Sequence, residues 1–111
     1  MSELERFESP GDHVATFTTD ELTALCPFDF GGPDYYTLTL RYRPDGYVVE
    51  SKSLKKCLED YREQEISAEA LAREIYEDVF ECIEPEACYV KLDQARRGGI
   101  EETVEVGHDP K

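Results

Sequence analysis

The sequence has few basic residues and no long apolar segment. Lysine and arginine number 12 against 26 aspartates and glutamates, so the 111-residue chain carries a formal net charge of -14. Such a surface repels phosphate backbones, which argues against non-specific nucleic-acid binding unless the basic residues cluster. No apolar run approaches the roughly 20 residues that cross a bilayer, and residues 1–5 lack the pattern of a signal peptide. We expect a cytoplasmic protein without a membrane segment.

Cysteine and histidine are too scattered to indicate a metal site. The four cysteines, at positions 26, 57, 82 and 88, form no C-x-x-C pair, and neither histidine lies at finger-like spacing. Without a secretory signal, free thiols are expected rather than disulfides. Cys57, Cys82 and Cys88 share the phase of apolar neighbours, so core packing accounts for them. No metal is expected.

The hydrophobic residues, 40% of the chain, are enough for a compact core. β-branched residues and short alternations predict a strand over residues 13–25, interrupted near Asp20. Residues 26–34 hold two prolines and two glycines and indicate a loop. Strict alternation predicts a second strand over residues 35–43, and residues 47–49 continue extended after a turn.

The apolar period then changes to three and four, which predicts two helices. The first spans about three turns from residue 51, with Ser51 or Ser53 as its N-cap. The second has Ser67 as its N-cap, an apolar stripe over residues 68–83, and Pro85 as its stop. Two further strands are predicted, joined by the glycines at positions 98 and 99.

The order ββααββ predicts an α+β fold, an antiparallel sheet with two helices on one face. Polar residues 1–12 and 107–111 are expected to be flexible tails around a single domain at residues 13–106. A short four-stranded sheet leaves its edges unpaired, and copies joined edge to edge into a closed barrel remove those edges. We therefore expect a homo-oligomer with its active site where subunits meet.

Cys26 and Asp34 flank the predicted loop between the first two strands. Cys26 precedes Pro27, where a thiol is reachable and held by rigid backbone. Asp34 lies eight residues later, so a close return of the chain would put a proton donor beside a nucleophile. A core thiol and a turn carboxylate are the structural alternatives. Asp29 is a second candidate for the acid.

The basic residues cluster once, in the string Glu50-Ser51-Lys52-Ser53-Leu54-Lys55-Lys56 at the start of the first predicted helix. Free N–H groups and the helix dipole bind anions there, and the lysines add to this, so one interpretation is a phosphate-bearing ligand. The other is a solvated helix face whose lysines pair with acidic neighbours.

Glu69 opens the second predicted helix, where the dipole favours a carboxylate for structural reasons alone. A carboxylate at an interface also accepts two hydrogen bonds from the N–H and amino edge of a guanine-like ring. Arg96 and Arg97 precede two glycines and are either a solvent-facing turn or further anion donors.

The order of these motifs is more informative than any one of them. Cys26-Pro27, Pro33-Asp34, the Glu-Ser-Lys-Ser-Leu-Lys string, Glu69 and Arg97-Gly98-Gly99-Ile100 follow one another over residues 17–100. In this order they resemble the QueF family of 7-cyano-7-deazaguanine reductases, whose signature is the lysine-containing string. The resemblance implies the tunnelling fold and an oligomeric barrel, either a pentameric ring or a stacked pair of rings.

The resemblance also implies a mechanism. Cys26 would attack the nitrile of 7-cyano-7-deazaguanine to give a covalent thioimide, Asp34 would donate the proton, and NADPH would deliver hydride twice. The aminomethyl product lies on the path to queuosine in tRNA. The implied substrate-binding residues are Glu69, Glu50 and Ser51, and the implied cofactor-binding residues are Ser51, Lys52, Lys55, Arg97 and Gly98.

Two alternatives stay open. The chain also resembles archaeal QueF-like amidinotransferases, which form the same thioimide and use ammonia to make archaeosine in tRNA, but which lack the lysine motif. The second alternative is a non-catalytic tunnelling-fold module that binds a purine-like ligand. It stays open because Ala68 stands where the reductases usually carry histidine. Either enzyme predicts that Cys26 is the accessible, most reactive thiol, whereas the module predicts a buried Cys26.

Overall fold

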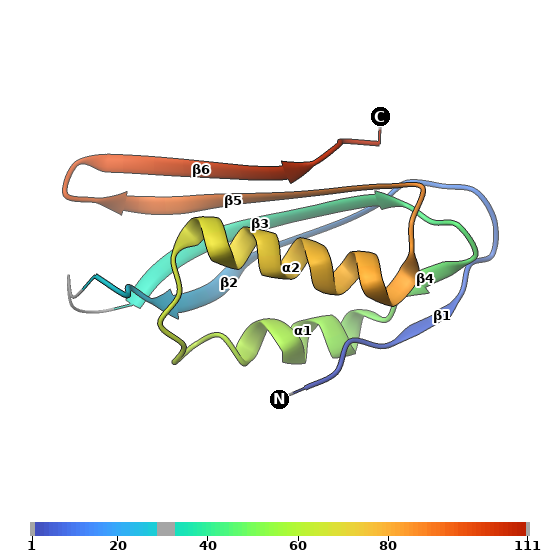
Figure 1. Cartoon of the computed structure of the whole chain (residues 1–111), viewed down its shortest axis with the longest axis horizontal. Coiled ribbons are helices and arrows are strands. Elements are labelled where there is room, and N and C mark those ends of the chain that lie inside the picture. Colours follow the sequence, from blue (N-terminus) through green and yellow to red (C-terminus); the bar gives the residue numbers. More distant parts are fainter. Residues whose placement is uncertain (1, 29–32, 111) are drawn as a thin grey trace.

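The computed structural model describes residues 2–28 and 33–110 and has two layers, a sheet and a pair of helices on one of its faces (Figure 1). The main sheet is antiparallel, in the order β2-β3-β5-β6. Its strands are β2 (Ala15–Leu25), β3 (Pro33–Arg43), β5 (Ala87–Arg97) and β6 (Ile100–Gly107). The helices are α1 (Ser51–Glu59) and α2 (Ala68–Ile83). The predicted α+β class and the position of both helices are confirmed.

The periodicities of the sequence explain the main elements. Along β3 every second residue from Asp34 to Tyr42 is buried beneath the helices. α2 buries its predicted stripe and ends at Ile83, two residues before Pro85. The register of β2 against β3 shifts between Thr19 and Leu22, which confirms the predicted interruption near Asp20. No helix within the described residues is long and apolar enough to cross a membrane.

The N-cap of α1 is Glu50, so the expectation of Ser51 or Ser53 is wrong. The Glu50 carboxylate accepts hydrogen bonds from Lys52 N at 2.9 Å and from Ser53 N at 2.7 Å. The longer acidic side chain thereby accepts hydrogen bonds from free N–H groups of the first turn, as shorter cap residues usually do. The Ser53 hydroxyl is buried and accepts a hydrogen bond from Glu5 N at 2.9 Å. Ser67 caps α2 as predicted, accepting from Ala70 N at 3.2 Å.

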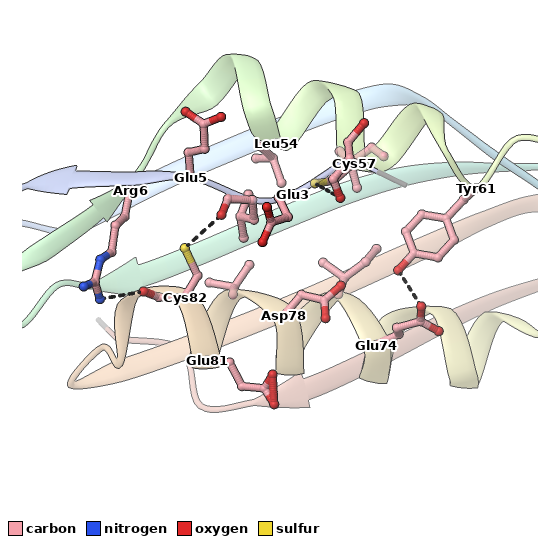
Figure 2. Close-up of a pocket in the computed structure, with 15 residues that line it drawn as sticks. Glu3, Glu5, Arg6, Leu54, Cys57, Tyr61, Glu74, Asp78, Glu81 and Cys82 are labelled. Carbon is pink, nitrogen blue, oxygen red and sulfur yellow. Dashed lines mark hydrogen bonds between the residues drawn. The ribbon is translucent and has the colours of Figure 1, made fainter.

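Ordered structure begins before the predicted domain start at residue 13. β1 (Arg6–Glu8) pairs antiparallel with β4 (Tyr47–Val49) in a small second sheet. Ahead of β1, Ser2 N donates to Asp60 Oδ2 at 2.6 Å. Figure 2 shows this N-terminal segment between the two helices, where Cys82 Sγ donates to Leu4 O at 3.6 Å. Backbone groups bond this segment to the helices, although its sequence has no strand periodicity.

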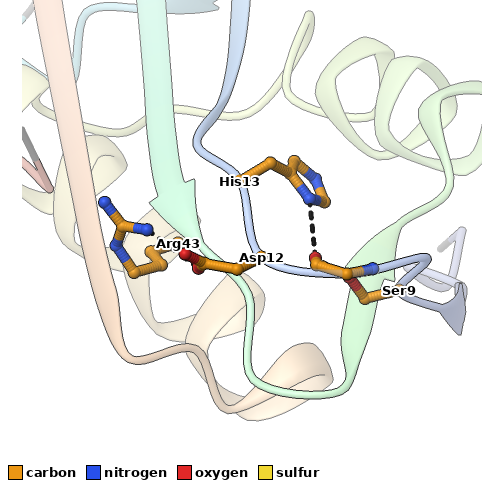
Figure 3. A network of polar contacts seen from close by, with 5 residues as sticks. Ser9, Asp12, His13 and Arg43 are labelled. Carbon is orange, nitrogen blue, oxygen red and sulfur yellow. Dashed lines mark hydrogen bonds and ion pairs between the residues drawn. The ribbon is translucent and has the colours of Figure 1, made fainter.

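The segment before β2 and the segment after β6 are also held by polar contacts. Arg43 Nη1 lies 2.8 Å from Asp12 Oδ1, which joins the segment before β2 to the end of β3 (Figure 3). In the same segment His13 Nδ1 lies 2.9 Å from Gly11 O. At the C-terminus His108 N donates to Cys88 O at 2.9 Å. The segment after residue 106 therefore continues along β5 instead of leaving the fold.

Candidate active site

The predicted catalytic segment lies at one end of the sheet, where β2 ends, β3 begins, the β5–β6 hairpin turns and α2 starts (Figure 1). The chain before α2 runs parallel to the end of β2. Leu25 N donates to Gln64 O at 2.8 Å, and Ile66 N donates to Leu25 O at 3.0 Å. This bridge places Cys26, the next residue, beside the first turn of α2.

A cavity of about 300 Å³ opens at this end of the sheet. Five of the nine predicted site residues line it: Cys26, Asp34, Glu69, Arg97 and Gly98. Ala68 and Glu102 line it as well. Asp29, the other candidate for the acid, lies outside the described residues. The structure therefore brings the predicted nucleophile, acid and base-binding carboxylate to one cavity, while their roles stay predictions.

Cys26 and Asp34 reach the cavity from opposite sides of the loop. Cys26 is half-buried, and its sulfur accepts a hydrogen bond from Phe28 N at 3.4 Å. Asp34 is 4% exposed and pairs in register with Ala24, two residues before the cysteine. Strand pairing thus fixes the carboxylate close to the thiol, which is the close return expected from the sequence.

Arg97 belongs to the same cavity as the predicted nucleophile. Its guanidinium forms an ion pair with the buried Asp34 carboxylate, which raises the pKa of Arg97. A register shift between Gln94 and Arg97 and a turn at Gly98 and Gly99, with φ of 58° and 83°, direct the arginine there. Glycine suits this turn because both positions need positive φ. Arg97 therefore lies apart from the α1 lysines with which it was grouped.

Glu69 and Glu102 of β6 line the same cavity, and each shifts the pKa of the other. Two neighbouring carboxyl groups resist ionising together, so one of them favours its protonated form. The interaction with Glu102, followed by the helix backbone, lowers the pKa of Glu69, while the interaction with Glu69 and burial raise the pKa of Glu102. Sequence reasoning missed Glu102, although it shares the inward phase of Val104 and Val106.

Tyr36 is a buried residue near the ionisable groups of this cavity. One register row crosses all four strands through Leu22, Tyr36, Gln94 and Glu102. Tyr36 is 2% exposed, and its hydroxyl has no hydrogen-bond partner among the residues that the structure describes. Burial, followed by the nearby Asp34 charge, raises the pKa of Tyr36, so the phenol keeps its proton. Sequence reasoning treated this residue only as core.

The remaining predicted residues are near the start of α1. Ser51 and Lys55 line a second cavity of about 330 Å³ between α1 and β2, together with Arg62 and Thr18. Glu50 and Lys52 are not among its lining residues. The Glu50 carboxylate already accepts two of the N–H groups that were expected to bind an anion, and these bonds lower its pKa. An anion at this helix start would therefore be bound by side chains rather than by these two N–H groups.

The other three cysteines pack as the sequence predicts. Cys57 and Cys82 are half-buried and Cys88 is buried. Burial raises the pKa of all three thiols, that of Cys88 to about 12. A larger cavity of about 780 Å³ lies beside Cys57 and Cys82 (Figure 2), and none of the predicted site residues lines it.

The cavity defines a class of protein: a small α+β fold that presents one thiol, an ion-paired aspartate and a pair of glutamates at the end of its sheet. The sequence model of the QueF-like protein family matches residues 33–111. The NADPH-dependent 7-cyano-7-deazaguanine reductase of Aquifex aeolicus is 38% identical, over 97% of this chain and 85% of that protein. The reductase of the same name from Thermomicrobium roseum is 39% identical, over 92% of this chain and 81% of that protein.

A solved structure agrees with these relatives. The crystal structure of the archaeosine synthase QueF-Like in its apo form superposes with a TM-score of 0.80 at 26% identity, over 90% of this chain and 95% of that one. The chain belongs to the QueF-like family, and its fold is the tunnelling fold predicted from the motifs.

Proposed function

We propose that this protein is an NADPH-dependent reductase that converts 7-cyano-7-deazaguanine to 7-aminomethyl-7-deazaguanine. The observation that carries the proposal is the shared cavity of Cys26, Asp34 and Glu69, which joins a nucleophile, a proton-transfer group and a base-binding carboxylate. Two relatives with the corresponding name, similar over most of their length, support it.

The first chemical step is carried by Cys26 and Asp34. The sulfur attacks the nitrile carbon, and the C–S bond forms as one C–N π bond opens. The thiol proton passes through the Asp34 carboxylate to the nitrile nitrogen, which completes a covalent thioimide. Arg97 keeps the carboxylate in place on the cavity wall through its ion pair. Asp34 thus first accepts the thiol proton and then donates it to the nitrile nitrogen.

Glu69 recognises the base. Its carboxylate accepts hydrogen bonds from the ring N–H and the exocyclic amino group, a pair of donors that a guanine-like edge presents side by side. Placement in the first turn of α2 favours the ionised form that such acceptance needs. Cys26 lines the same cavity, so its sulfur is available to the nitrile of a ring held by Glu69.

The residues beside α1 fit a phosphate-bearing cofactor. Lys55, Arg62 and the hydroxyls of Ser51 and Thr18 surround one cavity, and cationic and hydroxyl donors are the groups that bind phosphate. NADPH supplies hydride for the two reductions. Lys55 and Arg62 would bind its phosphates, and the exposed Lys52 of the same helix would add positive charge. Arg97 and Gly98 would act from the Cys26 cavity instead.

We expect the active form to be a homo-oligomer. Apart from the bridge at Leu25, no described strand pairs with the outer edges of β2 and β6. Edge-to-edge joining of copies would pair these backbone groups. It would also cover Phe28 and Ile100, which are 71% and 72% exposed near the cavity. The pentameric ring, the stacked pair of rings and the cytoplasmic location stay predictions.

The test mixes the protein with 7-cyano-7-deazaguanine and NADPH and follows nicotinamide absorbance together with the intact protein mass. Consumption of about two NADPH per substrate, the stoichiometry of a four-electron reduction, is expected. Cys26→Ala should abolish both turnover and the covalent adduct, and Cys57→Ala, which changes a packed thiol, should retain both. No NADPH loss and no adduct with the wild-type protein would refute the proposal.

The archaeosine synthase neighbour supports a second candidate, an amidinotransferase acting on the same nitrile in tRNA. Ammonia would then replace hydride at the thioimide. An adduct on Cys26 without NADPH loss, and incorporation of labelled ammonia into tRNA that carries the nitrile, would favour it. The non-catalytic module predicts neither adduct nor turnover.

A further inference from the structure

Glu69 and Glu102 form a carboxyl pair drawn from two different elements. Glu69 stands in the first turn of α2, and Glu102 lies on β6 opposite Gln94. Both line the cavity of Cys26, where each shifts the pKa of the other in the opposite direction. The shared cavity and these shifts favour one ionised and one protonated carboxyl group beside the proposed substrate site.

The edge of a guanine-like ring presents three groups in a row, a carbonyl oxygen, a ring N–H and an amino group. A single ionised carboxylate satisfies the two donors and leaves the carbonyl oxygen without a partner. An unsatisfied acceptor in a closed cavity costs more than a hydrogen bond gains, so the site needs a donor next to the carboxylate. A second carboxylate suits this position only if it keeps its proton.

We propose that Glu102 is a specificity-determining residue that stays protonated beside Glu69 and donates its proton as a hydrogen bond to the ring carbonyl of the bound base. The inference rests on the proposed function. In the free protein the same hydrogen bond goes to Glu69. Binding transfers it to the substrate, while Glu69 takes the two ring donors, so no proton is gained or lost.

The surroundings of Glu102 favour the neutral form. Glu69 of α2 brings negative charge to the same cavity, and burial further disfavours an ionised Glu102. Among the described lining residues Arg97 of β5 is the one cation, and its ion pair with Asp34 of β3 largely cancels both charges. Tyr36 of β3 stays neutral, and Cys26 stands at the end of β2. Ionised Glu102 would meet mainly like charge, which favours retention of its proton.

The test measures binding of 7-deazaguanine, which has the recognition edge but no nitrile, by calorimetry at a series of pH values that starts near 4.5, the ordinary pKa of a glutamate, and rises into the alkaline range. Wild-type affinity should fall as the pH rises through the raised pKa of Glu102. Glu102→Gln keeps a donor of the same shape. At the lowest pH the affinity of this variant should lie within about threefold of the wild-type affinity, and it should not depend on pH. Glu102→Ala should bind about tenfold more weakly than the wild type at the lowest pH, and the two affinities should converge as the pH rises.

Glu101→Gln, on the exposed face of the same strand, is the matched control and should bind as the wild type does. Circular dichroism confirms that each variant is folded. Equal affinities of Glu102→Ala and wild type at the lowest pH, or equal losses in the Gln and Ala variants there, would overturn the role of Glu102. If NADPH turnover of the nitrile substrate is intact in such a case, the proposed function stands. If wild-type protein neither binds 7-deazaguanine nor consumes NADPH, both fail.

Discussion

Tyr36→Phe should make the protein more stable, which is unusual for a change in a fully buried residue. The substitution removes one hydroxyl, keeps the ring, and takes away an atom that has no hydrogen-bond partner among the described residues. An unsatisfied buried polar group costs about 1–3 kcal/mol. The free energy of unfolding should therefore rise by about 1 kcal/mol or more, and the Tm by roughly 4 °C or more.

Tyr42→Phe is the matched control. Tyr42 lies on the same face of β3 and is 1% exposed, but its hydroxyl accepts a hydrogen bond from Val49 N at 3.0 Å. Removal of that acceptor should lower the free energy of unfolding by about 1 kcal/mol. Urea unfolding at one fixed protein concentration measures both variants. Equal or lower stability of Tyr36→Phe would show that its hydroxyl is satisfied in the folded protein and would refute the reasoning.

Three further predictions follow from the site and its surroundings. Iodoacetamide at neutral pH should label Cys26 first, as peptide mass mapping would show, because burial raises the pKa of the other thiols, Cys57, Cys82 and Cys88. Glu50→Ala should lower the Tm; since the folded pKa of Glu50 lies below the ordinary 4.5, the loss should be full above pH 4.5 and vanish as the pH falls through the lowered pKa. The larger cavity of Figure 2 is lined by the carboxylates of Glu3, Glu5, Glu74, Asp78 and Glu81. Raising salt from about 0.1 M to about 1 M should raise the Tm by screening their repulsion, and Glu3→Gln with Asp78→Asn should weaken that dependence.

The parts of the fold that could be predicted are those in which one face of an element is buried. β3 and α2 alternate or repeat their apolar residues because each covers a core, so their sequences contain the period. β1 has three exposed residues and pairs only through its backbone, so nothing in its side chains marks it. The cap of α1 was missed because statistics favour serine at a position that Glu50 occupies.

The candidate site could be predicted residue by residue but not as an arrangement. Cys26 and Asp34 flank one loop, so their proximity follows from a single turn of the chain. The ion pair of Asp34 with Arg97 joins positions 63 residues apart, which the pairing of β3 with β5 and the register shift at the end of β5 bring together. The resemblance implies one set of cofactor-binding residues, whereas the fold separates Lys55 of α1 from Arg97 at the hairpin.

The fold also decides which carboxyl of the glutamate pair carries the proton. Glu69 lies in the first turn of a 16-residue helix, where the dipole and free N–H groups stabilise negative charge. Glu102 lies on a strand, where no comparable dipole acts, and its neighbours across the cavity are mainly acidic. Glu102 on the strand therefore keeps the proton, and Glu69 on the helix is the hydrogen-bond acceptor. An edge with two donors and one acceptor can then be read by two identical side chains, because α2 and β6 hold them in opposite states of protonation.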